Sequence, residues 1–247
     1  MLIFIPMAGL SSRFSMAGYA QPKYMLPLWG RPVFDHALTS FSAYFEEARF
    51  VFCALDNPGI VDFVRGRCKH LRIQHFDLVK LDEVTRGQAE TVDLGLAGLE
   101  NEQGSPLVIF NIDSIRPNFH LDERYTGTSY LEVFKGEGDG WSFVVEDPAH
   151  PGRAIEVKEK QRVSRWCSNG LYVFADITTF REAYRAELAD PSQSINEHYV
   201  APVYNQLIRR GWPVGIRKLL PTETLFSGTP AEYERLRIAS YPEALSS

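Results

Sequence analysis

The sequence is poor in cysteine and contains none of the short spacings that usually bind a structural metal. It has three cysteines, Cys53, Cys68 and Cys167, without a Cys-x-x-Cys pair, and its six histidines form no His-x-His or His-x-x-x-His spacing. Structural zinc sites are built from such clusters. We therefore expect no structural zinc and three reduced thiols, as is usual in the cytoplasm.

Long apolar runs are missing as well. No apolar stretch approaches the ~20 residues that a helix needs to cross a bilayer. The first residues, Met1 to Pro6, have neither the basic start nor the long apolar segment of a signal peptide. The sequence therefore predicts a cytoplasmic protein without a membrane partner.

The chain also lacks an excess of positive charge. It has 26 Lys and Arg against 31 Asp and Glu, a formal net charge of −5. Nucleic-acid binding depends mainly on neutralising phosphates, so we expect no such partner, whereas a small phosphorylated ligand needs only a few local cations. With 45% hydrophobic and 23% charged residues among 247, the composition is that of a folded globular protein.

Apolar patterning predicts alternating strands and helices in the first 115 residues. Short, continuous apolar runs are typical of buried parallel strands, and apolar spacings of three and four indicate helices. Strands are predicted at 2–5, 49–55, 71–76 and 106–112, and helices at 33–45, 60–68 and 88–99. This alternation predicts a mostly parallel, doubly wound sheet between two layers of helices.

The second half of the chain has a different order of elements. Strands are predicted at 129–134, 141–146, 154–158, 170–174 and 214–219, and helices at 180–188, 196–210 and 231–237. No repeat or low-complexity linker divides the chain. We therefore expect a single three-layer α/β/α domain over residues 1–247, with a mixed sheet in its second half.

A loop of small residues follows the first predicted strand, and it reads Ala8-Gly9-Leu10-Ser11-Ser12-Arg13. Ligands of open α/β sheets bind at the carboxyl ends of strands, where the N–H groups of such a loop can approach a phosphate. Arg13 and, ten residues later, Lys23 supply cations. The loop is neither G-x-G-x-x-G nor G-x-x-x-x-G-K-[ST]. It indicates a polyphosphate cradle of another kind, the alternative being a tight turn beside a surface Arg and Lys.

Asp113 closes the most apolar of the predicted strands, in Asn111-Ile112-Asp113. At the carboxyl end of a central strand it faces the same crevice as the small-residue loop. Mg²⁺ commonly takes one or two protein carboxylates together with phosphate oxygens. Asp113 is therefore a candidate Mg²⁺ ligand, the alternative being a cap on the following turn.

These residues resemble the nucleotidyltransferase family that includes the sugar-1-phosphate nucleotidylyltransferases (NDP-sugar pyrophosphorylases). The resemblance rests on the first strand, the loop with Arg13, Pro22-Lys23 and Asp113, and it continues over nearly the whole chain. Further matching segments are Arg86-Gly87-Gln88-Ala89, Glu156-Val157-Lys158-Glu159-Lys160, Gly170-Leu171-Tyr172-Val173-Phe174 and Gly228-Thr229-Pro230 with Glu232. Among subgroups the chain is most similar to members from bacterial capsule and surface-polysaccharide synthesis.

The resemblance implies a Rossmann-like, GT-A-type sheet with a nucleotide-binding half (1–115) and an acceptor-binding half (116–247). It implies Mg²⁺-assisted transfer of a nucleotidyl group from an NTP to a phosphorylated acceptor, foremost a sugar 1-phosphate, with release of pyrophosphate. The implied catalytic residues are Arg13, Lys23 and Asp113, of which Asp113 binds the metal. The implied nucleotide-binding residues are Ala8, Gly9, Leu10, Ser11, Ser12 and Gln88, and the implied acceptor-binding residues are Glu159, Lys160, Asn196 and Glu197.

Two positions depart from the family pattern. Ser11 stands where a second loop glycine is usual, and Phe226 and Ser227 precede Gly228, where many members carry a second metal-binding aspartate. The second metal ligand is therefore open, although Glu223 lies close in sequence.

Several alternatives stay open at this point. Taken alone, the alternating charges Glu156, Lys158 and Lys160 would form the solvent-exposed face of a strand. Likewise, Asn196 and Glu197 would be the acidic first turn of a helix. The acceptor could be a non-sugar phosphate such as a phospho-amino acid, to which a cytidylyl group is transferred from CTP. A GT-A-type glycosyltransferase and a non-catalytic nucleotide-binding module are the two other classes, although glycosyltransferases commonly need a D-x-D metal motif that this chain lacks. Homo-oligomers are an option that the sequence does not decide.

Overall fold

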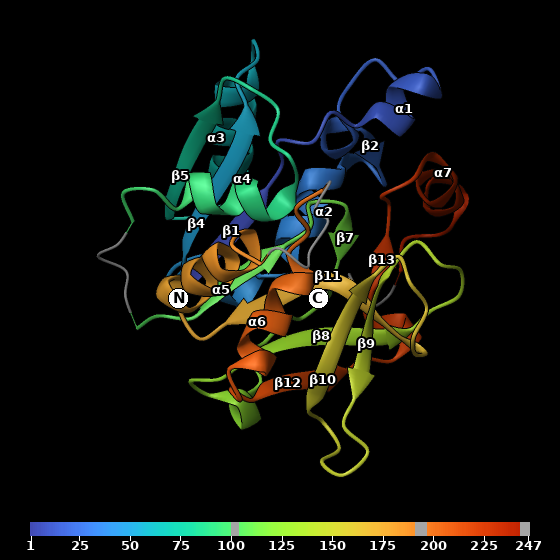
Figure 1. Cartoon of the computed structure of the whole chain (residues 1–247). Coiled ribbons are helices and arrows are strands. Elements are labelled where there is room, and N and C mark those ends of the chain that lie inside the picture. The colour runs from blue at the N-terminus through green and yellow to red at the C-terminus, as the bar shows by residue number, and fades with distance from the viewer. Residues whose placement is uncertain (100–103, 191–196, 243–247) are drawn as a thin grey trace.

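The central sheet sends its side chains alternately into two apolar layers. The computed structural model describes residues 1–99, 104–190 and 197–242, and within these ranges nine strands form one sheet (Figure 1). In β1 (Leu2–Pro6), Leu2 and Phe4 enter one core, whereas Ile3 and Ile5 enter the other. Successive side chains of a strand point to opposite faces, so a fully apolar strand needs cover on both sides.

Four parallel strands form the first half of the sheet, in the order β6-β1-β4-β5. Their bounds are β4 (Arg49–Leu55), β5 (His75–Leu81) and β6 (Leu107–Phe110). One face is covered by α2 (Val33–Thr39) and α3 (Ile60–Leu71), and the other by α4 (Gln88–Gly95), α5 (Ile177–Leu188) and α6 (Tyr204–Arg209). The predicted single α/β/α domain with a doubly wound, Rossmann-like sheet is confirmed.

The second half adds strands that are mostly antiparallel. They are β8 (Ser129–Lys135), β9 (Ser142–Glu146), β10 (Ala154–Glu159), β11 (Trp166–Phe174) and β12 (Val214–Lys218). β11 runs antiparallel to β6, β8 and β9, whereas β12 is parallel to β8. Two short pairs stand apart from this sheet: β2 (Pro27–Leu28) with β3 (Arg31–Pro32), and β7 (Ser114–Ile115) with β13 (Leu225–Phe226).

β11 changes partners along its length. Its residue Cys167 pairs with both β8 and β9, and from Leu171 onward the strand pairs with β6. β6 and β9 therefore lie on the same side of β11 but at different ends of it. The sheet is split between them at residues 168–170, which belong to neither pairing.

Three predicted elements differ most from the structure in their bounds. The strand predicted at 71–76 is at His75–Leu81, because α3 continues to Leu71 and ends at Arg72 in the left-handed conformation. The helix predicted at 33–45 ends at Thr39. The helix predicted at 196–210 starts only at Tyr204, after a 3-10 turn (Ala201–Val203), because the backbone of His198 pairs with the turn at Arg86–Ala89.

The first and last helices of the described chain pack against each other. They are α1 (Ser12–Met16) and α7 (Pro230–Ile238), and they lie side by side in Figure 1. The ring of Tyr233 lies 6.1 Å from that of Phe14 and 5.6 Å from that of Tyr19, between centroids. Segments from opposite ends of the sequence are thereby joined beside the carboxyl edge of the sheet.

All three cysteines are buried and unpaired, and burial raises the pKa of Cys53 and Cys68 to about 12. Across the described ranges, no group of three or more His, Cys, Asp or Glu side chains is arranged to hold a metal. None of the helices that the structure describes is long and apolar enough to span a membrane.

Glu187 in α5 is a buried acid with an unpartnered oxygen. Its side chain is 6% exposed, and Oε2 has no hydrogen-bond partner in the structure. Burial raises the pKa of Glu187 to about 7, against the smaller opposing effect of Arg209. The folded state therefore holds this proton more tightly than the unfolded chain, whose glutamates titrate near 4.5.

We expect the stability that this proton supplies to be complete below about pH 4.5 and to disappear as the pH rises through about 7. Glu187→Gln stays neutral throughout. The free energy of unfolding of the wild type, relative to that of Glu187→Gln, should therefore fall by about 3 kcal/mol between pH 4.5 and pH 8. Urea titrations across this range measure it. Glu182→Gln, on the exposed face of the same helix, is the control, and a Glu187 difference independent of pH would contradict the assignment.

Candidate active site

A cleft of about 1020 Å³ opens at the carboxyl ends of the parallel strands and reaches the split in the sheet. The predicted site residues that line it are Ala8, Gly9, Leu10, Ser11, Ser12, Arg13, Lys23, Gln88, Asp113, Glu159, Lys160 and Glu197. Asn196 lies outside the described residues. The lining comes from both predicted halves of the chain, although the functional division between them stays a prediction.

Ser11 adopts the backbone conformation that a glycine would take. Its φ of 51° and ψ of 32° lie in the left-handed region, which a glycine enters without steric cost. The Ser11 hydroxyl oxygen accepts a hydrogen bond from the backbone N–H of Lys23 at 3.3 Å. The departure from glycine therefore keeps the geometry of the loop and adds a side-chain contact to the Lys23 segment.

The predicted catalytic residues meet in this cleft. The Lys23 ammonium group donates a hydrogen bond to Oδ2 of Asp113, which is 90 residues away in sequence. Their side chains are 25% and 17% exposed, so both are half-buried and still open to the cleft. Arg13, on α1, is exposed and lines the same cleft. Two cations and a carboxylate thus face one space beside the small-residue loop.

The backbone of Asp113 is held by the segment that carries β13. Ser227 donates two hydrogen bonds to the Asp113 carbonyl oxygen, from its N–H at 2.8 Å and from its hydroxyl group at 3.0 Å. The next residue, Gly228, leaves a space beside the Asp113 carboxylate, and a Cβ there would lie 2.8 Å from Oδ2 of Asp113 and would displace it. Glu232 borders this position and also lines the cleft, although the sequence argument gave it no role.

Gln88 is positioned by a close backbone approach. A Cβ on Gly87 would lie 2.5 Å from the backbone nitrogen of His198, so only glycine fits. The Gln88 amide then donates to Oδ1 of Asn111 at 2.5 Å. Asn111 was not predicted as a site residue, although it stands two positions before Asp113. The pair presents amide groups to the cleft, which can read the donors and acceptors of a base.

Lys160 lies at the other end of the cleft, directly after β10. It has a φ of 53°, and its N–H donates to the Trp141 carbonyl oxygen at 2.9 Å. Its ammonium group donates to the Tyr199 hydroxyl oxygen and lies 3.5 Å from Oε2 of Glu197. The hydrogen bond with Tyr199 is the main cause that raises the pKa of Lys160. No sequence pattern marks Tyr199. It is 39 residues away from Lys160 in the sequence, and only the fold places the two side chains in contact.

Glu159 differs from its neighbour Lys160 in its surroundings. Burial raises its pKa, and the hydrogen bond donated by the Ser142 hydroxyl group works in the opposite direction. This end of the cleft therefore pairs an ammonium group of raised pKa with a carboxyl group that gains a proton more readily than usual.

Phe226 is part of an aromatic wall. Its ring centroid lies 4.9 Å from those of Phe134 and Trp141, and Trp141 and Phe226 both line the cleft. Neither Phe226 nor Ser227 can supply the second metal carboxylate, because one is apolar and the other binds the Asp113 backbone. Glu223 does not line the cleft; its carboxylate lies 3.5 Å from the Arg116 guanidinium group.

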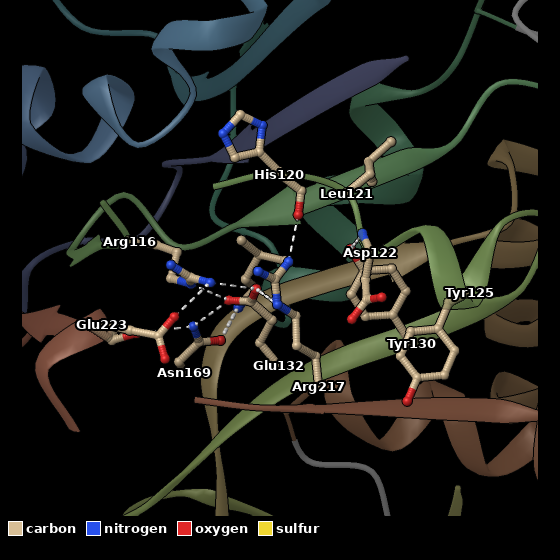
Figure 2. A network of polar contacts seen from close by, with 12 residues as sticks. Arg116, His120, Leu121, Asp122, Tyr125, Tyr130, Glu132, Asn169, Arg217 and Glu223 are labelled. Carbon is tan, nitrogen blue, oxygen red and sulfur yellow. Dashed lines mark hydrogen bonds and ion pairs between the residues drawn. The ribbon is translucent and has the colours of Figure 1, made fainter. Parts of the chain in front are cut away.

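A buried charge network, drawn in Figure 2, adjoins the cleft through Asn169, which lines it. Arg116 is 2% exposed and its Nε lies 2.8 Å from Oε2 of the fully buried Glu132. Glu132 also accepts a hydrogen bond from Asn169 at 3.0 Å and has Arg217 at 3.4 Å. Together with Glu223, these side chains join β8, β11, β12 and the segments before β13 and after β7.

This network supports the floor of the cleft. Asn169 stands between Ser168 and Gly170, in the split of the sheet, and all three line the cleft. Its carbonyl oxygen accepts a hydrogen bond from the Ser114 hydroxyl group at 3.0 Å, directly after Asp113. The buried charges therefore hold β11 beside β7, the strand that begins directly after Asp113.

We expect Glu132→Gln to lower the free energy of unfolding by about 3 kcal/mol, because it leaves the buried Arg116 guanidinium group without its close carboxylate. Thermal melts should show a fall in Tm of about 10 °C. Glu156→Gln, which removes a strand glutamate from an exposed ion pair at 3.1 Å, is the control and should change stability by less than about 0.5 kcal/mol. Equal melting temperatures for the two variants would contradict the structural role of the network.

Comparison with known proteins identifies relatives among solved structures. No family model matches the chain, and a search of curated proteins finds no match either. The chain is similar to a nucleoside-diphosphate-sugar pyrophosphorylase from Vibrio cholerae RC9, with 42% identity, a TM-score of 0.91, and coverage of 96% of this chain and 100% of that one.

Two more distant structures share the fold. An inositol-1-phosphate CTP transferase from T. maritima is 18% identical, with a TM-score of 0.71 over 95% of this chain and 94% of that one. A UDP-glucose pyrophosphorylase complexed with UDP-glucose is 13% identical, with a TM-score of 0.74 over 96% of both chains. The 42% identity over the whole length of the Vibrio protein carries the family assignment and favours a transferase over the glycosyltransferase and non-catalytic alternatives. The chain belongs to the sugar-phosphate nucleotidylyltransferases and is a nucleotidyltransferase enzyme.

Proposed function

We propose that the protein transfers a nucleotidyl group from a nucleoside triphosphate to a sugar 1-phosphate and releases pyrophosphate. An oxygen of the acceptor phosphate attacks the α-phosphorus, a new P–O bond forms, and the bond from the α-phosphorus to the bridging oxygen of the leaving pyrophosphate breaks. The acceptor is already an anion, so the reaction needs positioning and charge stabilisation more than a strong base.

The convergence of Arg13, Lys23 and Asp113 on one cleft is the observation that carries this proposal. The loop N–H groups and Arg13 would bind the β- and γ-phosphates that leave as pyrophosphate. Lys23, which contacts Asp113, would neutralise the charge that grows on the α-phosphate. A volume of about 1020 Å³ exceeds that of most single-ligand sites, which fits a cleft for two substrates.

The opposite end of the cleft fits a phosphorylated acceptor. Lys160 would bind the acceptor phosphate, and Glu159 would accept a hydrogen bond from an acceptor hydroxyl group. Gln88, fixed by Asn111, would contact the base of the nucleotide. Glu197 holds Tyr199 beside Lys160 and completes this end of the site. We place the product among the precursors of bacterial capsule or surface polysaccharides, in the cytoplasm.

A magnesium ion fits the donor set at Asp113. The carboxylate is half-buried, faces the cleft, and borders a gap that a Cβ at Gly228 would fill. Carboxylate and phosphate oxygens are the ligands that Mg²⁺ prefers. The ion would supply additional positive charge to the triphosphate oxygens.

We expect Lys23→Ala and Asp113→Asn each to lower the rate of pyrophosphate release by about 10²- to 10³-fold, because each removes charge stabilisation at the reacting phosphate. A coupled pyrophosphate assay with Mg²⁺, NTPs and a panel of sugar phosphates measures it. Lys80 and Asp56 form a matched ion pair at 2.8 Å outside the cleft, so Lys80→Ala and Asp56→Asn are the controls. Full turnover in either cleft variant would refute the role assigned to that residue.

The preferred base can be found without knowledge of the acceptor. A ligand that binds only the folded state raises Tm by mass action, so one NTP with Mg²⁺ should raise Tm by several degrees more than the others. The same NTP should then support turnover. A phospho-amino acid in the acceptor panel tests the non-sugar alternative: turnover with it and none with sugar phosphates would overturn the sugar assignment and leave the transfer reaction in place.

A further inference from the structure

We infer that Glu232 is the second carboxylate of the metal site, acting with Asp113 in place of the aspartate that the β13 segment lacks. The inference rests on the proposed function, since it concerns the metal that accompanies the triphosphate. The family pattern places the second metal ligand at the end of β13. Glu232 lies after β13, on α7.

Asp113 and Glu232 border one small gap. A Cβ built on Gly228 would lie 2.8 Å from Oδ2 of Asp113 and 3.6 Å from Oε2 of Glu232. Glycine leaves this position without a side chain, so nothing of residue 228 stands between the two carboxylates. The Asp113 oxygen nearest to residue 228 also accepts the hydrogen bond from the Lys23 ammonium group, so a metal at this oxygen would share it with that lysine or replace the contact.

The other acidic side chains of the cleft have different surroundings. Those that line it besides Asp113 are Glu137, Glu159, Glu197 and Glu232. Glu159 accepts from Ser142, and Glu197 accepts from Tyr199, both at the Lys160 end of the cleft. Glu137 follows β8, and its carbonyl oxygen accepts from the Trp141 indole N–H at 2.8 Å. Of these four, only Glu232 borders the gap beside Asp113.

One oxygen of Glu232 is engaged and the other is available. Oε2 accepts a hydrogen bond from the Thr229 backbone N–H at 2.9 Å, which forms the capping box of α7. Within the described ranges, Oε1 has no hydrogen-bond or ion-pair partner. The capping contact fixes the carboxylate at the start of the helix through Oε2, which is also the oxygen nearest to residue 228, and Oε1 stays available to a metal or to a water molecule bound to it.

The neighbouring residue holds this helix in place. Tyr233 is 2% exposed, its ring packs on Phe14 and Tyr19, and its hydroxyl group donates to the Pro27 carbonyl oxygen at 2.7 Å. Phe14 belongs to α1, the helix that follows the small-residue loop. Glu232 is therefore fixed relative to the segment that would bind the triphosphate, which is the condition for a shared ligand set.

The test measures Mn²⁺ binding rather than turnover. Mn²⁺ is titrated into wild type, Asp113→Asn, Glu232→Gln and Glu234→Gln by electron paramagnetic resonance, with ATP, CTP, GTP, UTP and dTTP present in turn. Glutamine keeps the capping hydrogen bond and removes only the charge, so Glu232→Gln should fold with an unchanged Tm. Glu234 lies on the same helix and pairs with Arg237 at 2.7 Å outside the cleft, which makes Glu234→Gln the matched control.

We expect Glu232→Gln to weaken Mn²⁺ binding in the ternary complex by about tenfold, Asp113→Asn by at least as much, and Glu234→Gln not at all. Wild-type affinity in Glu232→Gln would overturn the inference, as would a wild-type protein that binds the triphosphate but no Mn²⁺. Failure of the proposed function has a different signature, because a protein that binds Mn²⁺ and triphosphate but releases no pyrophosphate would leave the metal ligands assigned.

Discussion

The buried ion pair between Arg116 and Glu132 is the constraint on which the geometry of the cleft depends. Removing two charges from water costs several kcal/mol for each ion, so such a pair contributes little net stability unless further hydrogen bonds complete it. Here Asn169 and Arg217 do so. Because these partners come from different strands, the pair fixes β8, β11 and β12 relative to one another at the split in the sheet, which apolar packing alone specifies less strictly.

The split brings distant segments together around one space. β11 leaves β9 after Cys167 and joins β6 from Leu171, so residues 168–170 form the floor of the cleft. The small-residue loop and Asp113 reach it from the parallel strands, and Lys160 reaches it from the end of β10. The contact between Lys23 and Asp113, 90 residues apart, is a direct consequence of this arrangement.

The sequence predicts the parallel half and most of the candidate site because local chemistry marks them. Apolar strands, the loop from Ala8 to Arg13, and Asp113 at a strand end each follow from residue type and position. Tyr199 and Asn111 carry no such mark, since the fold alone brings them to Lys160 and Gln88. The helix predicted from residue 196 fails for the same reason: the His198 backbone pairs with a turn more than 100 residues earlier, and no local pattern contains that contact.

The two departures from the family pattern have different physical consequences. At Ser11 the required property is a backbone conformation, and a serine meets it at a modest steric cost while its hydroxyl group supports Lys23. At Phe226 the missing property is a negative charge, which no backbone adjustment can replace. A charge can be supplied from another element, however, provided that element is held rigidly. The packing of Tyr233 on Phe14 meets this condition for α7, and it is why a carboxylate beyond β13 can serve where the strand itself has none.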